Sequence, residues 1–110
     1  MDAPDRFAAL VDALATDPGV TPPDADGARR FGSGTLRAGG SIFAMLAVDA
    51  VVLKLPSDRV AALLADGAGR PFSSGKGQPY REWVALPDGD PATDLALARE
   101  ALAFVRSRRR

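Results

Sequence analysis

The chain has 110 residues, a formal net charge of zero, and a composition that is 46% hydrophobic and 25% charged, as is typical of one globular domain. It contains no cysteine and no histidine. Disulfides, thiolate nucleophiles and zinc–thiolate sites are therefore excluded, and an enzyme would lack the usual general base. No apolar run approaches the ~20 residues that span a bilayer, and residues 1–10 do not resemble a signal peptide. We expect one cytoplasmic domain over residues 1–110, with no cofactor, no metal and no membrane partner.

The first helix is predicted over residues 3–16. Phe7, Leu10, Val11 and Leu14 recur at helical spacing and form one apolar stripe. Residues 17–27 follow with three prolines and two glycines, which predicts a loop or an extended connection.

Three strand-like runs are predicted between residue 30 and residue 55. Two short turns separate them, so an antiparallel meander is expected, and Gly39 and Gly40 supply the positive φ of the first turn. Gly32 and Gly34 would allow the first strand to bend or bulge. In the third run Val51, Leu53 and Leu55 alternate with Val52 and Lys54, which predicts one buried face and an outward-facing lysine.

A second helix is predicted after Pro56, with Ser57 as its N-cap, an apolar stripe of Val60, Leu63 and Leu64, and Gly67 as its stop. Residues 67–80 are polar and glycine-rich, which indicates a loop.

Residues 81–87 are predicted to form another strand. Trp83 alternates there with Glu82, so we expect the tryptophan to pack in the core. Asp90 and Pro91 then cap and begin a last helix over residues 91–106, whose expected apolar stripe is Leu95, Ala98, Leu102 and Val105.

This order of elements predicts an α+β two-layer sandwich of the form α-β(3)-α-β(2)-α. The strands cannot cover their own faces, so the helices should pack together on one face of an antiparallel-rich sheet.

The glycine-rich stretch GTLRAGGS, residues 34–41, nearly matches a phosphate-binding loop. Gly40 occupies the lysine position, however, and a strand-like segment follows where a helix should begin. Hairpin glycines explain the stretch better than nucleotide binding does.

The segment RRFGSGTLRAGGSIFAMLAVDAVVLKL, residues 29–55, resembles the N-terminal domain of the TfoX/Sxy competence-regulator family. The similar features are two arginines before Phe31-Gly32, the Phe43-Ala44 strand, the turn acid Asp49 and the Leu53-Lys54 ending. GRPFSSGKGQPYREWVALP, residues 69–87, and ALAFVRS, residues 101–107, resemble later segments of the same family.

This resemblance implies a YjbR-like fold and a regulatory or interaction role in a bacterium, without a known active site. The full-length regulators carry a second domain that this chain is too short to hold, so competence regulation itself does not transfer.

The candidate interaction residues are basic. They flank the first hairpin, the loop before residue 81, and the C-terminal tail RSRRR over residues 106–110: Arg29, Arg30, Arg37, Lys76, Arg81, Arg106, Arg108, Arg109 and Arg110. On one interpretation they contact nucleic acid phosphates. On the other they are scattered surface charges and cations at a helix C-terminus.

Three other features have both a functional and a structural interpretation. The loop SSGKGQPY, residues 73–80, could hold an anion or be a plain polar loop. Tyr80 and Trp83 could stack on a base or pack internally. Asp88 and Asp90 have no third ligand in view, which favours a turn and cap over a metal site.

The primary hypothesis is a non-enzymatic regulatory or protein-interaction domain that binds a protein partner or a second copy of itself. The alternative is a nucleic-acid-binding accessory protein that uses the hairpin arginines and the tail. An enzyme based on carboxylates ranks third, because the sequence offers no obvious pair of acids.

Overall fold

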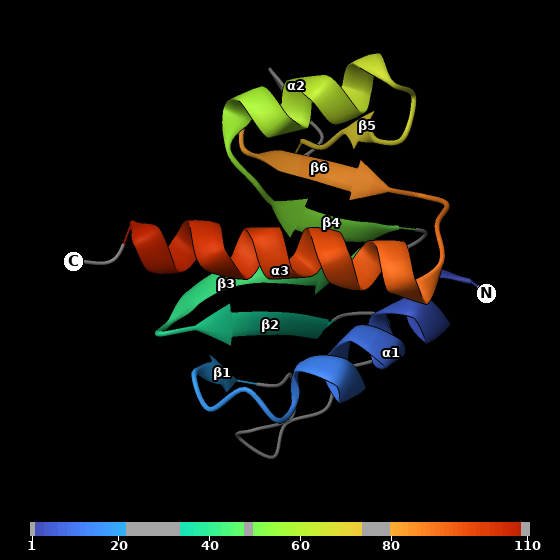
Figure 1. Ribbon diagram of the computed structural model, residues 1–110. Coiled ribbons are helices and arrows are strands. Elements are labelled where there is room, and N and C mark those ends of the chain that lie inside the picture. Colours follow the sequence, from blue (N-terminus) through green and yellow to red (C-terminus); the bar gives the residue numbers. More distant parts are fainter. Residues whose placement is uncertain (1, 22–33, 48–49, 74–79, 109–110) are drawn as a thin grey trace.

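The computed structural model describes residues 2–21, 34–47, 50–73 and 80–108 (Figure 1). Its elements in chain order are α1 (Ala3–Leu14), β1 (Val20–Thr21), β2 (Gly34–Ala38), β3 (Ser41–Leu46), β4 (Val51–Lys54), α2 (Ser57–Ala65), β5 (Arg70–Pro71), β6 (Trp83–Leu86) and α3 (Pro91–Ser107).

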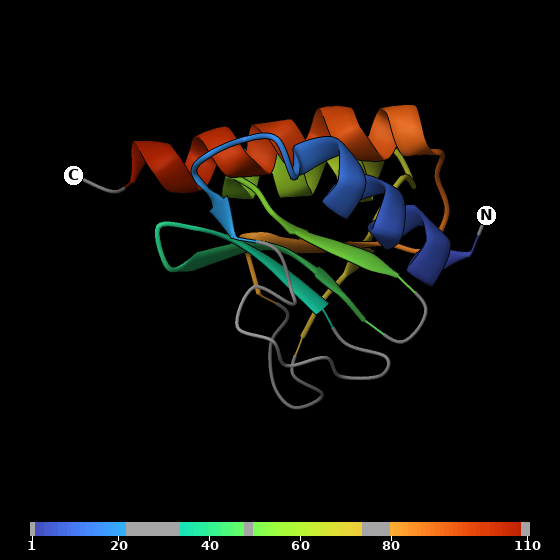
Figure 2. The same ribbon diagram turned by 90° about the horizontal axis from the view of Figure 1, so that it is seen from below.

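The strands form one six-stranded sheet in the order β1-β2-β3-β4-β6-β5, and every neighbouring pair is antiparallel. Figure 2 shows all three helices on the same side of this sheet. The α+β class, the meander of β2, β3 and β4, and the placement of the helices are therefore confirmed. We call the sheet surface that faces away from the helices the open face.

The sheet has one strand more than predicted before α2. Val20 and Thr21 lie in a segment expected to be a loop or an extended connection, and they pair with Ala38 and Arg37. Val20 is buried and Thr21 is exposed. A strand of two residues is too short to show an alternating pattern, which explains why the sequence did not predict it.

Acidic caps define the starts of α1 and α3. The side chain of Asp2 accepts a hydrogen bond from the Asp5 amide at 3.1 Å, and that of Asp90 accepts one from the Thr93 amide at 2.9 Å. The predicted role of Asp90 is confirmed. The predicted N-cap of α2 is wrong: Pro56 holds that position without a side-chain cap, and Ser57 is the first helical residue.

The end of α2 is a glycine stop, as predicted. Gly67 has a φ of 76°. Its amide donates to the Leu64 carbonyl at 3.1 Å, and the Ala68 amide donates to the Leu63 carbonyl at 3.0 Å. This pair of bonds is a Schellman motif, which requires the left-handed backbone that glycine adopts most easily.

Replacing Asp90 with alanine should lower the thermal midpoint at neutral pH. Hydrogen bonds from Thr93 hold the pKa of Asp90 below its ordinary value of 3.8. The carboxylate therefore stabilises the fold above that value, and this stabilisation is lost as the pH falls through the folded-state pKa. Thermal melts near pH 7 and near pH 2 check this: the difference from the wild type should shrink in acid. The control Asp12→Ala, at an exposed position, should show a much smaller loss than Asp90→Ala near pH 7.

The β2–β3 hairpin turns at Gly39 and Gly40, whose φ angles are 58° and 87°, as predicted. The irregularity in the hairpin does not lie at a glycine. The register shifts between Leu36 and Arg37, where Leu36 pairs with Ala44 and Arg37 with Ile42. Phe43 is the extra residue, so it and Ala44 are both fully buried in succession. Gly32 lies outside the described residues.

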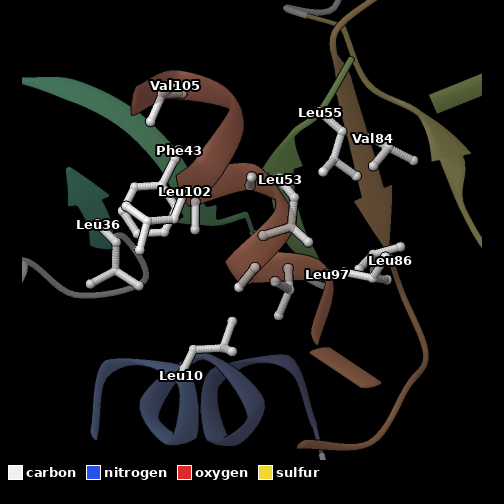
Figure 3. Packing of buried hydrophobic residues seen from close by; sticks show 14 of the residues in the cluster. Leu10, Leu36, Phe43, Leu53, Leu55, Val84, Leu86, Leu97, Leu102 and Val105 are labelled. Carbon is white, nitrogen blue, oxygen red and sulfur yellow. The ribbon is translucent and has the colours of Figure 1, made fainter. Parts of the chain in front are cut away.

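The hydrophobic core lies between the sheet and the helices (Figure 3). Phe43, Leu53 and Val84 come from the sheet, Leu55 follows β4, and all four are fully buried. The stripe of α1 is largely as predicted, with Val11 only partly buried. In α3 the predicted Leu95 is also only partly buried, and the helix instead contributes these buried apolar residues: Leu97, Ala98, Ala101, Leu102 and Val105.

Lys54 lies on the open face, as the alternation in β4 predicts. Val52 lies on that same face because it precedes Lys54 by two residues, yet it is fully buried. Val52, at the centre of the open face, is therefore not exposed to solvent, whereas Arg37 on β2 and Arg70 on β5 are exposed.

Candidate functional site

The predicted basic residues are only partly within the described structure. Arg29, Arg30, Lys76, Arg109 and Arg110 lie outside the described residues.

Four members lie within the described structure, and all four are at one end of the molecule: Arg37, Arg81, Arg106 and Arg108. Arg37 is next to the last residue of β2, Arg81 precedes β6, and Lys54 at the end of β4 pairs with Trp83 at the start of β6. This is also the end where α3 finishes, since Arg108 of α3 contacts Glu82.

Both described arginines of the tail are in ion pairs. Arg106 Nη2 lies 2.6 Å from Asp17 Oδ1, and Arg108 Nη1 lies 2.7 Å from Glu82 Oε1. Arg108 also lies over the Phe104 ring, 5.2 Å from its centroid. The tail arginines thus fasten the end of α3 to the loop after α1 and to the start of β6, and their charge is largely balanced.

The Asp17–Arg106 pair changes the pKa of the Asp17 carboxyl group. The Arg106 guanidinium, helped by the Gly19 amide and the nearby charge of Arg99, holds the pKa of Asp17 below its ordinary value of 3.8. The carboxylate stays ionised at neutral pH, so it keeps Arg106 engaged.

One pocket is an open groove between the C-terminal end of α1 and the second half of α3, with a volume of about 740 Å³. In Figure 1 the two helices lie close at the N-terminal end of α3 and diverge toward its C-terminal end. We call this pocket the α1–α3 groove. Its apolar lining is Ala13, Leu14, Pro18, Leu102 and Ala103, and its polar lining is Thr16, Asp17, Arg99, Arg106 and Ser107.

Arg99 is the arginine of this groove with no ion pair among the described residues. It is exposed on α3, and sequence reasoning did not select it. The groove therefore combines an apolar floor with one unpaired and one paired guanidinium, which suits an apolar segment that carries a carboxylate.

The prediction that Trp83 packs in the core is wrong. Val84 and Leu86 take the core side of β6, with exposed fractions of 0% and 2%, whereas Trp83 is half-buried and does not belong to the core cluster. Trp83 pairs across the sheet with Lys54, whose Nζ lies 5.7 Å from the centroid of the tryptophan ring. Trp83 thus lies on the open face.

Two further aromatic residues lie beside Trp83. The Phe72 ring centroid is 6.4 Å from that of Trp83 and 6.1 Å from that of Tyr80. The Tyr80 amide donates to the Phe72 carbonyl at 2.9 Å, which holds the two residues together. We call Lys54, Phe72, Tyr80 and Trp83 the aromatic corner.

A smaller pocket of about 450 Å³ adjoins the aromatic corner. Its lining consists of Ser57, Tyr80, Arg81, Glu82 and Trp83. Tyr80 is 45% exposed, which is exceptional for a large hydrophobic side chain in the described part of this chain.

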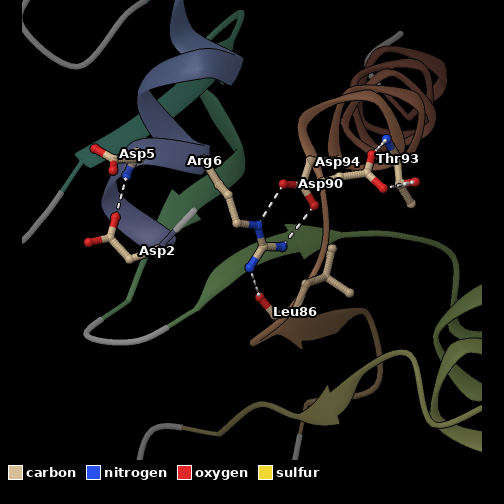
Figure 4. Close-up of polar contacts among 7 residues, drawn as sticks. All are labelled: Asp2, Asp5, Arg6, Leu86, Asp90, Thr93 and Asp94. Atoms are coloured by element: carbon tan, nitrogen blue, oxygen red, sulfur yellow. Dashed lines mark hydrogen bonds and ion pairs between the residues drawn. The ribbon is translucent and has the colours of Figure 1, made fainter.

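The most buried polar group lies apart from both pockets and was missed by sequence reasoning. Arg6 and Asp94, 0% and 1% exposed, form a bidentate pair with distances of 2.7 Å and 2.8 Å (Figure 4). Arg6 also donates to the Leu86 carbonyl at 3.0 Å. The hydrogen bonds to Asp94 raise the pKa of Arg6 above its ordinary value. This pair joins α1, β6 and α3, and both of its charges are satisfied, so it is a structural element rather than a reactive one.

The described acids show no metal-binding arrangement. Within residues 2–21, 34–47, 50–73 and 80–108, no group of three or more acidic side chains converges on a point. In the same ranges, no helix has the length and apolar character needed to cross a bilayer.

Comparison with known proteins gives no relative: no family model, no curated protein and no solved structure matches this chain.

Proposed function

We propose that this chain is a non-enzymatic protein-interaction domain, of the regulatory type that its resemblance to the TfoX N-terminal domain implies. The α1–α3 groove is its contact surface, and the partner is a protein segment that presents apolar side chains next to acidic ones. The observation that carries the proposal is the apolar floor of the groove with Arg99 beside it.

The groove supports this function through its shape and its charge. An amphipathic helix or an extended segment buries its apolar side chains in such a depression, which is a recurrent mode of peptide recognition. Arg99 offers its guanidinium to a carboxylate of the partner, and arginine is well suited to such pairing at interfaces.

The two edges of the sheet are poor alternatives. β1 and β5 are the outer strands, and each has two residues. Pro71 in β5 also cannot donate a hydrogen bond to an added strand. Short edges with proline are a common protection against strand addition, so the partner is expected on the helical side.

Selection from a phage-displayed library of random 12-residue peptides tests the proposal. We expect enrichment of peptides that place aspartate or glutamate next to apolar residues. Arg99→Glu should weaken their binding at least about tenfold, because like charges in a contact are repelled. The matched control Arg70→Glu, an exposed arginine on β5, should bind the peptides as the wild type does.

Two results would contradict the proposed function. One is a selection that enriches no peptides with acidic residues. The other is peptide binding that survives Arg99→Glu unchanged while the variant keeps the wild-type circular dichroism spectrum.

A further inference from the structure

We propose that the aromatic corner and the pocket beside it form a second binding site, for single-stranded nucleic acid. A base stacks on Tyr80 and contacts Trp83, while Lys54, Arg70 and Arg81 pair with phosphates. Of the predicted basic residues this site uses Arg81, and it does not use the tail arginines Arg106 and Arg108, which are engaged by acids.

The aromatic residues of the corner offer ring surface to a ligand. Tyr80 and Trp83 both line the pocket, and 45% of the Tyr80 surface is exposed. Phe72, the residue after β5, lies beside both rings, at centroid distances of 6.1 Å from Tyr80 and 6.4 Å from Trp83. Rings held in this way lose little freedom when a base stacks on them, and every base has a face that can stack.

The charged residues of the described strands are all basic. The described strands contain three charged residues, Arg37, Lys54 and Arg70, and no acid. The strand registers place all three on the open face: Arg37 pairs with Ile42, Lys54 with Trp83, and Arg70 with Ala85.

The cations nearest the corner have no acidic partner in the described structure. Lys54, Arg70 and Arg81 form no ion pair among the described residues. Glu82 lines the pocket, but its carboxylate is held by Arg108 at 2.7 Å. The pocket therefore favours an anion, and the neighbouring rings favour an anion that carries a flat aromatic group.

A single strand meets both requirements better than a duplex does. Stacking on Tyr80 needs a base face that is not already covered by its neighbours, and a duplex hides these faces. Lys54, Trp83 and Arg70 lie on the neighbouring strands β4, β6 and β5, so the proposed site spans three adjacent strands and suits a narrow ligand. An acidic peptide would satisfy the cations without using the ring faces.

Trp83 provides a direct test, because it is the only tryptophan in the chain. Unlabelled 12-nucleotide oligo(dT) is titrated into the intact protein at low salt while tryptophan emission is recorded. We expect saturable quenching. With three phosphate contacts, a plot of log affinity against log salt should have a slope of about −2.

Variants locate the site. Tyr80→Ala, an exposed position, should weaken binding about 5- to 150-fold through the lost stacking. Arg81→Ala should weaken binding and make the salt slope shallower by about 0.7. Arg99→Ala is the matched control: it removes one arginine charge from the α1–α3 groove and should bind oligo(dT) as the wild type does. Oligo(dT) binding thus tests this site, and peptide binding tests the proposed function, so the two proposals can fail separately.

Three results would overturn the inference. The first is no change in Trp83 emission with oligo(dT) at low salt. The second is unchanged affinity in Tyr80→Ala. The third is equally tight binding of polyglutamate or of a 12-base-pair duplex, which would show that charge alone is recognised.

Discussion

Replacing Asp94 with alanine is expected to lower the free energy of unfolding by about 3–5 kcal/mol, because it leaves the guanidinium of Arg6 buried without its counter-charge. Arg6 is 0% exposed and makes two of its three hydrogen bonds to this carboxylate. The third, to the Leu86 carbonyl, cannot neutralise the charge. Urea unfolding of the wild type and the variant at neutral pH measures the loss.

A double variant separates the buried charge from packing. Arg6→Met together with Asp94→Leu removes both charges and keeps apolar volume, and such replacements are often close to neutral. We therefore expect the double variant to be more stable than Asp94→Ala alone. Asp12→Ala, an exposed change on α1, is the matched control. If Asp94→Ala were as stable as Asp12→Ala, the pair would not fasten the three elements as we describe.

Replacing Phe43 with alanine is expected to cost about 3–5 kcal/mol, the usual range for deleting a buried phenylalanine. The register shift in the β2–β3 hairpin turns Phe43 toward the helices, where it is fully buried in the core cluster near Leu102 and Val105 (Figure 3). Removing the ring leaves a cavity that the surrounding strands can fill only in part. Chemical denaturation measures the change.

The adjacent Ile42 is the control for Phe43. It is half-buried and pairs with the exposed Arg37 on the open face. Ile42→Ala should therefore cost clearly less than Phe43→Ala. Equal losses, or a larger loss at Ile42, would contradict the placement of the irregularity that brings Phe43 into the core.

Much of the framework could be predicted because it depends on local patterns. The stripe of Phe7, Leu10 and Leu14 marked α1, the turn at Gly39 and Gly40 marked the hairpin, and Asp90 marked the start of α3. Each of these signals acts over a few residues, where spacing and turn chemistry decide the local structure. The α+β arrangement follows from them, since one sheet and three amphipathic helices have few ways to bury their apolar faces.

The site depended on choices that local patterns leave open. Alternation in β6 allowed either Trp83 or the Val84–Leu86 pair to face inward. The large size of tryptophan favoured the core position for Trp83, and that prediction was wrong. The two aliphatic residues together fill the space under α2 and α3, and that outcome is set by tertiary packing. The signal that could have corrected the prediction is that Val84 and Leu86 are both large aliphatic residues, whereas Trp83 shares its side of the strand with the small Ala85.

The Arg6–Asp94 pair joins residues 88 positions apart in the chain, so no short sequence motif predicts it. One hint was available in the sequence: Arg6 lies on the same helical face as Ala3 and Leu10, both of which are buried. A charged residue inside an apolar stripe needs a buried partner. Arg99 escaped notice for the opposite reason, because only the divergence of α1 and α3 distinguishes it from other surface arginines.

The measurement that tests the central claim most directly is a map of amide chemical-shift changes on the ¹⁵N-labelled protein, titrated with the strongest peptide from the display selection. The account predicts that the largest changes fall along the α1–α3 groove, at Ala13, Leu14, Arg99, Leu102 and Ala103, while the amides of β5 and β6 stay nearly unchanged. Changes concentrated on the open face, or spread evenly over the chain, would contradict a protein-interaction role for the groove.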